Sequence, residues 1–220
     1  MKISNNTINV LKSFSKISEN ILITPGNVLR TRSESQNVFA RVVVEEEFEK
    51  EVSIYSLSRF LSSISLLDDP DYQFEDDRVI ISSKITNLIY KYAHKSMIIF
   101  PKNDSVKLPS IDSTFEFDYE DIKKVMQASA VLGKQFVRFL GNEEGIFITT
   151  YDDRTEDTDV YSIQISENAG HDFAYIFPIT MFNILPLNYT VELFKAQAMH
   201  LNNGNIDYWL APSSISKFNK

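Results

Sequence analysis

Short runs of β-branched and aromatic residues recur along almost the whole chain, and they limit its possible folds more than any other feature. Runs of this kind are typical of β-strands. Turn-forming residues separate them, as in Pro25-Gly26 and in the Asn-rich segment 202–205. The predicted strands are residues 37–44, 48–55, 78–84, 87–93, 96–100, 114–118, 136–140, 145–151, 160–166, 173–177, 189–194 and 206–211.

Four other stretches have the apolar spacing of short amphipathic helices. Glu120 and Asp121 suit the N-terminus of the third, and Gly133 suits its C-terminus. The predicted helices are residues 5–18, 56–67, 119–132 and 178–185. Together with the strands, they predict a protein of the α+β class.

Two segments of the first half recur in the second half in the same order. Residues 54–60 match 176–182 at an offset of 122, and apolar positions of 8–17 match 122–131 at an offset of 114. This duplication predicts two similar domains, each with two short helices packed on antiparallel sheets. We place them at 1–108 and 109–220, with a connector at about 101–113 that contains proline and lacks strand periodicity.

The sequence carries no recognisable catalytic or metal-binding motif. Because cysteine is absent, disulfides, thiolate zinc sites and cysteine nucleophiles are excluded. There is no P-loop, GxSxG, HExxH or GxGxxG, and His94, His171 and His200 lack the spacing of metal ligands. We therefore predict that the protein is not an enzyme and has neither a cofactor nor a metal. The acidic runs 45–47, 68–69 and 152–159 are predicted to be solvated surface.

Neither a membrane span nor a secretion signal is predicted. No apolar run is long enough to cross a bilayer, and the N-terminal segment lacks the continuous apolar core of a signal peptide. This predicts a cytoplasmic protein that does not associate with a membrane.

The charges are unevenly distributed between the predicted helices and the rest of the chain. The chain has 22 basic and 30 acidic residues, a net charge of −8, yet the polar faces of the helices carry almost no acid. Either short helices simply carry lysines on their solvated faces, or a helical surface is kept positive for a polyanion. Asn and Gln between the lysines favour loose phosphate contact over base readout. The residues concerned are Asn5, Asn9, Lys12, Lys16, Arg59, Lys123, Lys124, Gln127 and Lys134.

Several stretches resemble the DNA polymerase sliding clamp of T-even-type bacteriophages. They are TINVLKSFSKI, ILITPGNVLRTR and VSIYSLSRFLSSISLL in residues 1–67, and FEFDYEDIKKVMQASAVLG in the second half. The resemblance implies the DNA-clamp fold and a homotrimeric ring, with helices lining the hole and sheets forming the outer wall. Such a ring slides on duplex DNA without sequence specificity and tethers DNA polymerase, and a clamp-loader ATPase opens it. It performs no chemistry, and in an infected cell it works in the host cytoplasm.

The resemblance also implies where the partners bind. The polar helix residues given above would face the DNA. The subunit interface is expected at Met97, Ile98, Ile99 and Phe100, paired with Val160, Tyr161, Ile163 and Ile165. A pocket for partner peptides is expected at Leu108, Pro109, Ile111, Tyr208, Trp209 and Leu210.

Two other functions stay open at this point. One is a non-enzymatic phage protein of another class, either a virion component or a transcription-regulating protein. The other is an enzyme with an unrecognised carboxylate site, such as a nuclease. The sequence does not decide whether a ring of this kind also serves late transcription.

Overall fold

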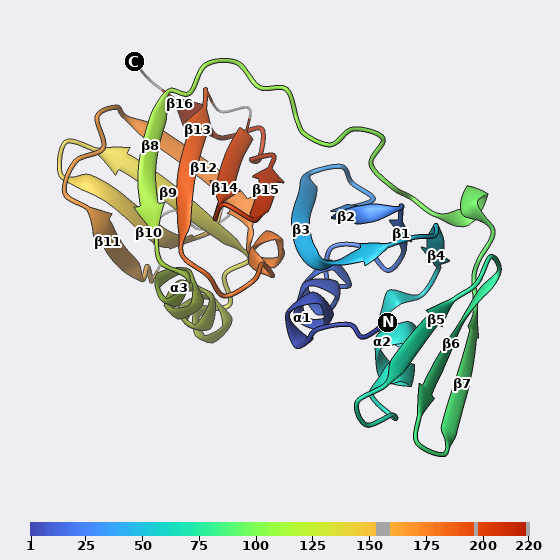
Figure 1. Ribbon diagram of the computed structural model, residues 1–220. Helices are drawn as coiled ribbons and strands as arrows, with labels where there is room; N and C mark the ends of the chain where they lie inside the picture. The colour runs from blue at the N-terminus through green and yellow to red at the C-terminus, as the bar shows by residue number, and fades with distance from the viewer. Residues whose placement is uncertain (153–158, 196–197, 219–220) are drawn as a thin grey trace. The chain divides into compact units, whose positions relative to one another are not determined.

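The computed structural model describes residues 1–152, 159–195 and 198–218 (Figure 1). The chain divides into two compact units, Met1–Ser105 and Val106–Lys220. The predicted domain limits, 1–108 and 109–220, stay a prediction, since compactness does not test whether each part folds alone.

The first unit consists of two α-helices and antiparallel sheets. β1 pairs with β4, β2 pairs with β3, and β5, β6 and β7 form a three-stranded sheet in that order. The elements are α1 (Asn5–Phe14), β1 (Ile21–Ile23), β2 (Gly26–Arg32), β3 (Val38–Phe48), β4 (Val52–Ile54), α2 (Leu57–Ile64), β5 (Asp71–Phe74), β6 (Arg78–Ser83), β7 (Thr86–Lys91) and the 3-10 turn η1 (Lys95–Met97).

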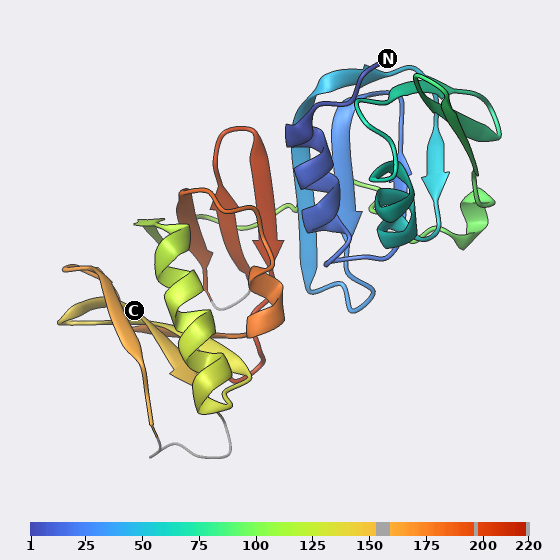
Figure 2. The ribbon, with the colours of Figure 1, turned by 90° about the horizontal axis from the view of Figure 1, so that it is seen from below.

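Helices α1 and α2 lie side by side in this unit (Figure 2). α1 packs on β3 and buries Val10, Leu11 and Phe14, while α2 buries Leu57, Phe60, Leu61 and Ile64. Removing apolar surface of this size from water is the main stabilising contribution, about 25 cal/mol per Å². Each helix therefore has one buried face and one face exposed to solvent.

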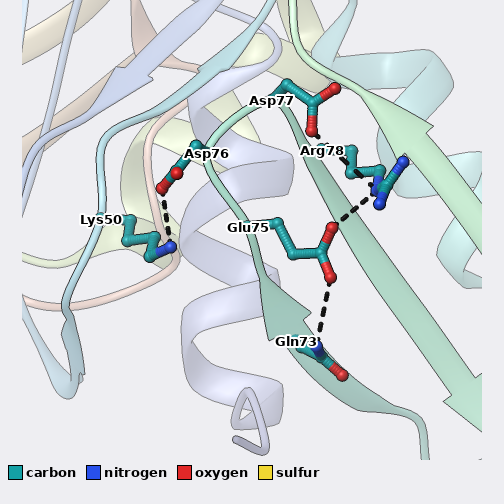
Figure 3. A network of polar contacts seen from close by, with 6 residues as sticks. All are labelled: Lys50, Gln73, Glu75, Asp76, Asp77 and Arg78. Carbon is teal, nitrogen blue, oxygen red and sulfur yellow. Dashed lines mark hydrogen bonds and ion pairs between the residues drawn. The ribbon is translucent and has the colours of Figure 1, made fainter.

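Polar contacts join the turn after β3 to the β5–β6 hairpin (Figure 3). Lys50 Nζ lies 2.7 Å from Asp76 Oδ1, and Arg78 Nε donates to Glu75 Oε2 at 2.7 Å. Gln73 Nε2 donates to the other Glu75 oxygen at 3.2 Å. Such pairs at the surface contribute little to stability, and of these three contacts the Lys50–Asp76 pair is the one that connects the two turns.

The second unit contains two antiparallel sheets and one long helix. One sheet has the order β11-β10-β9-β12-β16, and in the other β8, β13, β14 and β15 are successive neighbours. The elements are β8 (Ser113–Phe117), α3 (Tyr119–Leu132), β9 (Phe136–Asn142), β10 (Gly145–Tyr151), β11 (Ser162–Ser166), β12 (Phe173–Pro178), the 3-10 turn η2 (Ile179–Phe182), β13 (Tyr189–Phe194), β14 (Ala198–Asn202), β15 (Ile206–Leu210) and β16 (Lys217–Phe218).

An aromatic cluster forms the core of this unit. The Phe139 ring lies 5.6 Å from Phe182, 6.0 Å from Phe117 and 6.1 Å from Phe177, measured between centroids. α3 packs across β9, β10 and β11 and buries Ile122 and Val125 against them. The predicted α+β class with antiparallel sheets is confirmed.

The predicted fourth helix is wrong. Pro178 is the last residue of β12 and pairs with Phe136 of β9, so the strand takes up the expected start of the helix. The Ile179 N–H is then donated to Gln135 O, and only the four residues of η2 remain before Pro186. The described residues of the second unit thus form one α-helix where two were expected.

The strand predicted at 96–100 is also wrong. The N–H groups of Met97 and Ile98 bond back to His94 and Lys95 and form η1. The Ile99 N–H is donated to the Asn20 side chain at 2.8 Å. Because these donors already have acceptors in η1 and in the Asn20 side chain, no ladder forms here.

Two predicted boundaries shift. The predicted strands 37–44 and 48–55 are divided differently, because β3 continues to Phe48 and a turn at 49–51 precedes β4. The first helix ends at Phe14, and single turns continue to Ser18. Lys16 therefore lies just beyond the helix. Most of the acidic run 152–159 lies outside the described residues.

Candidate nucleic-acid interface

The N-terminus of α1 is anchored by a buried carboxylate from β3. Ser4 caps the helix, with its Oγ accepting the Thr7 N–H at 3.2 Å. Glu46 accepts the Ser4 N–H on one oxygen and the Thr7 hydroxyl on the other, both at 2.5 Å. Burial favours the neutral acid, but these hydrogen bonds outweigh it and lower the pKa of the Glu46 carboxyl. The helix is therefore tied to the sheet at its positive end.

Glu46 corrects the prediction that the run 45–47 is uniformly solvated. It is 9% exposed, whereas Glu45 and Glu47 are exposed. The alternation of β3 puts residues 40, 42, 44, 46 and 48 on the buried side. That period of two was visible in the sequence and could have identified Glu46 as an inward residue.

The outer face of α1 is polar and free of acid. Asn5, Asn9 and Lys12 are exposed on the helix, and Lys16 is exposed in the turn that follows. Among the described residues, no carboxylate forms an ion pair with either lysine. Asn20, in the segment between α1 and β1, is buried at 7% exposure, and its side-chain oxygen accepts the Ile99 N–H.

α2 presents hydroxyl groups and one arginine. Arg59 is exposed as expected, next to Ser58 and Ser62. Glu19, which the sequence did not single out, lies at the N-terminus of this helix. Its carboxylate accepts the hydroxyls of Ser56 at 2.7 Å and Ser58 at 2.9 Å. An acid at this end favours the helix but reduces the positive potential there.

α3 differs from α1 in how its lysines are used. Lys123 lies 3.0 Å from Glu120 and Lys124 lies 3.2 Å from Asp121, both as i,i+3 pairs. The hydrogen bond and charge of Asp121 raise the pKa of Lys124. Gln127 is exposed between the two pairs and the end of the helix.

The end of α3 is set by Gly133. Its φ of 67° is left-handed, which glycine adopts without steric cost, and the following Lys134 N–H is donated to Ser129 O at 2.8 Å. Lys134 itself is only half-exposed. The predicted cations of the second unit are thus more neutralised, or less exposed, than those of α1.

The predicted interface residues do not form two matching strands. Met97 is 54% exposed in η1, Ile98 is buried, and Ile99 and Phe100 lie in irregular chain. Ile163 and Ile165 do lie in β11, which is an outer strand of its sheet, and Val160 and Tyr161 precede it. The last strand of the first unit is β7, also an outer strand, which the sequence reasoning did not select.

The residues of the predicted peptide pocket differ in their surroundings. Pro109 and Ile111 are exposed in the connector and Leu108 is half-buried. Tyr208 and Leu210 are fully buried in the core of the second unit, where the Tyr208 oxygen accepts the Leu185 N–H at 3.2 Å. Trp209 is stacked on His200 at 4.6 Å.

Exposed, flexible ammonium groups of this kind suit one class of ligand. Lysines without acidic partners attract the phosphates of a nucleic acid whatever its base sequence. The neighbouring Asn side chains supply neutral hydrogen bonds. Such contacts are weak individually and leave a polyanion free to move.

Comparison with known proteins finds similar proteins of one kind. The family model described as DNA polymerase processivity factor matches residues 3–100. The sliding clamp of Vibrio phage KVP40 is 27% identical over 222 residues, which is 98% of this chain and 100% of that protein. The sliding clamp of Escherichia phage RB69 is 28% identical over 226 residues, 98% of each chain. Over almost its whole length, the chain is similar to the sliding clamps of T-even-type phages. It is a DNA polymerase processivity factor, and this family is non-catalytic.

Solved structures show that the clamp shares its fold with clamps of cellular organisms. A. fulgidus PCNA, bound to the C-terminal region of FEN-1, has a TM-score of 0.69 at 15% identity over 94% of both chains. The Helicobacter pylori beta clamp, bound to a DNA ligase peptide, has a TM-score of 0.68 at 11% identity over 97% of this clamp and 65% of that chain. The DNA-clamp fold is thereby confirmed. None of the described helices is long and apolar enough to span a membrane.

Proposed function

We propose that the clamp is a homotrimeric ring that encloses duplex DNA and tethers DNA polymerase during synthesis. α1, α2 and α3 face the DNA, a clamp-loader ATPase opens the ring, and the clamp itself catalyses no reaction. Its place of action is the host cytoplasm, because its relatives are phage clamps.

The charge of α1 is the observation that supports this most. A chain with a net charge of −8 exposes Lys12 and Lys16 on a face without acid. In a chain with more acids than bases, a random distribution of charge does not favour a helix face that has lysines and no acid. A surface that encloses a polyanion requires a face of this kind.

Ring closure is proposed to join the edges of β7 and β11. Each is an outer strand, and an open outer strand presents unpaired N–H and C=O groups to a second strand. Ile89 on β7 is 58% exposed, and Ile85 at the hairpin tip is 99% exposed. A head-to-tail contact of two different edges closes into a ring only if the rotation from one subunit to the next is a whole fraction of a full turn. For the proposed ring that fraction is one third, which gives three subunits.

The charges beside the two edges are complementary. Lys84 precedes β7 and Lys91 is its last residue, whereas Asp159 precedes β11 and Glu167 follows it. Opposite charges at both ends favour this pairing over pairing of two identical edges. The proposed interface therefore moves from Met97–Phe100 to β7 and keeps the β11 side.

Partner peptides are proposed to dock at the connector. Ile111 is 50% exposed and Val106 is 39% exposed there, and such side chains suit an apolar contact. PCNA and the beta clamp are each described with a bound partner segment. With Tyr208 and Leu210 in the core, the connector residues Leu108, Pro109 and Ile111 remain as the contact side chains.

Two measurements test the ring. Sedimentation equilibrium over a concentration series is expected to reach three times 25.3 kDa, and Ile89→Asp is expected to lower that mass towards one chain. Leu66→Asp, the same kind of change at an exposed apolar side chain of this unit outside β7, is the matched control. Loaded clamp is expected to stay on closed circular DNA and to leave it once the circle is cut. A monomer at every concentration contradicts the proposal.

A further inference from the structure

The outward face of the β2–β3 hairpin gathers arginines. Arg30 lies directly opposite Arg41 in the ladder, and Arg32 is two residues along on the same face. The outward positions next to them, Val28 and Val43, are apolar and half-buried. Like charges placed opposite one another weaken a ladder unless an anion lies near them.

The connector supplies such an anion. Asp104 forms an ion pair with Arg30 Nη1, and Arg30 Nη2 donates to Thr24 Oγ1 at 2.9 Å. Burial and the nearby Arg41 charge lower the pKa of Arg30. Its side chain is 20% exposed, which makes the guanidinium a rigid, partly desolvated cation.

Asp104 is attached far less firmly than Arg30. Its side chain is 75% exposed, and it lies in connector residues that belong to no helix or strand. An ion pair with one such exposed partner contributes little, so a second carboxylate can replace it at small cost.

We infer that Arg30 anchors a carboxylate of the partner peptide, and that Asp104 occupies this position while no partner is bound. The partner segment is an extended peptide with acidic residues among apolar ones, because the guanidinium favours carboxylates and the adjoining Val28 and Val43 favour apolar side chains. This inference rests on the proposed function, since it assumes that partners dock at the connector.

A double-mutant cycle tests it with the full-length cognate DNA polymerase as the probe and no DNA present. Arg30→Gln is expected to weaken polymerase binding roughly tenfold, and Asp104→Asn to strengthen it roughly threefold, as for charge pairs at an interface. In the Arg30→Gln background, Asp104→Asn is expected to change nothing, because the two carboxylates then have no cation to compete for. Asp69→Asn, which removes the exposed pair with Lys2 in the same unit, is the matched control and should be neutral.

Other outcomes overturn the inference. If Arg30→Gln and Asp104→Asn weaken binding equally, the pair is a structural link of the connector and not an anchor. If neither changes binding while the wild-type clamp binds polymerase and stays on circular DNA, the inference fails and the proposed function stands. If the wild-type clamp does not bind polymerase, both fail. Sedimentation and thermal unfolding of each variant identify any loss through misfolding.

Discussion

α1 and α3 are each the first helix of their unit, yet they offer a polyanion different charges. α1 has no acid, and neither Lys12 nor Lys16, which follows the helix, has an ion-pair partner among the described residues. Lys123 and Lys124 of α3 are paired with acids one turn earlier. The comparison shows that the number of lysines on a helix does not by itself set the positive potential of its surface.

The helices are also anchored differently. α1 depends on a long-range contact, since Glu46 lies on a strand far along the chain. α3 is capped locally by Asp118, whose side chain accepts the Glu120 N–H at 2.9 Å. A change in the sheet can therefore affect α1 and leave α3 unaffected.

The largest effect is expected from Glu46→Ala. It leaves the Ser4 N–H and the Thr7 hydroxyl without their buried acceptor, at a cost of about 2–3 kcal/mol in the free energy of unfolding. Urea unfolding measures this. Glu45→Ala changes an exposed neighbour on the same strand and should cost less than about 0.5 kcal/mol. Equal losses from both variants would show that Glu46 does not anchor the helix.

Charge reversal compares the two lysine pairs directly. Lys12→Glu with Lys16→Glu is expected to weaken retention on circular DNA by about tenfold or more, because six cations of a trimer become anions. Lys123→Glu with Lys124→Glu is expected to have a smaller effect, since those charges are already offset by Glu120 and Asp121. Retention at increasing salt concentration measures both.

An equal loss from the two double variants would remove the proposed difference between α1 and α3. Unchanged retention in both would contradict the assignment of the helices to the DNA. Sedimentation equilibrium of each variant shows whether the ring itself is intact.

A smaller effect is expected from Asp118→Ala. Loss of the N-terminal cap of α3 costs about 1 kcal/mol, and Asp118→Asn should restore most of it because an amide oxygen also accepts the hydrogen bond. Chemical unfolding of the two variants measures the difference. If Asp118→Asn is as unstable as Asp118→Ala, the carboxylate acts through its charge and not as a cap.

The smallest effect is expected when the pH is lowered, which reduces the free energy of unfolding as Glu46 becomes protonated. The pKa of Glu46 is lowered in the folded clamp. Its contribution is therefore complete above the unfolded-state pKa of about 4.3 and is lost as pH falls through the lower folded value. Unfolding followed from pH 7 downwards should show this loss in the wild type and a reduced loss in Glu46→Gln. Parallel pH curves would contradict the assignment.

The sequence predicts much of this fold because most strands have strong local signals. β9, β10 and β13 begin or end within two residues of the predictions. The strands that were missed are β1, β2, β5, β14 and β16. DYQF of β5 and AMHLN of β14, for example, have weak strand propensity and are held by their neighbours in the sheets. η2 replaced a helix for the same reason: pairing of Pro178 with Phe136 outweighed the local helical pattern.

The candidate site was less predictable because it depends on contacts between distant residues. The exposure of Lys12 follows from the helical period, and the spacing of Glu120 to Lys123 already indicated an i,i+3 pair. The pairing of Arg30 with Asp104 has no local signal, since 74 residues separate them. Only the folded arrangement brings such groups together.

The unequal charge of α1 and α3 also affects the symmetry of the proposed ring. Two similar units in each of three subunits suggest sixfold symmetry, but electrically the ring would have only three strong positions alternating with three weak ones. For DNA, which is a rod of uniform negative charge, the axis of such a ring is not the position of lowest electrostatic energy. It gains by leaning towards one of the three attractive positions, so the DNA axis would tilt and change direction as the ring advances.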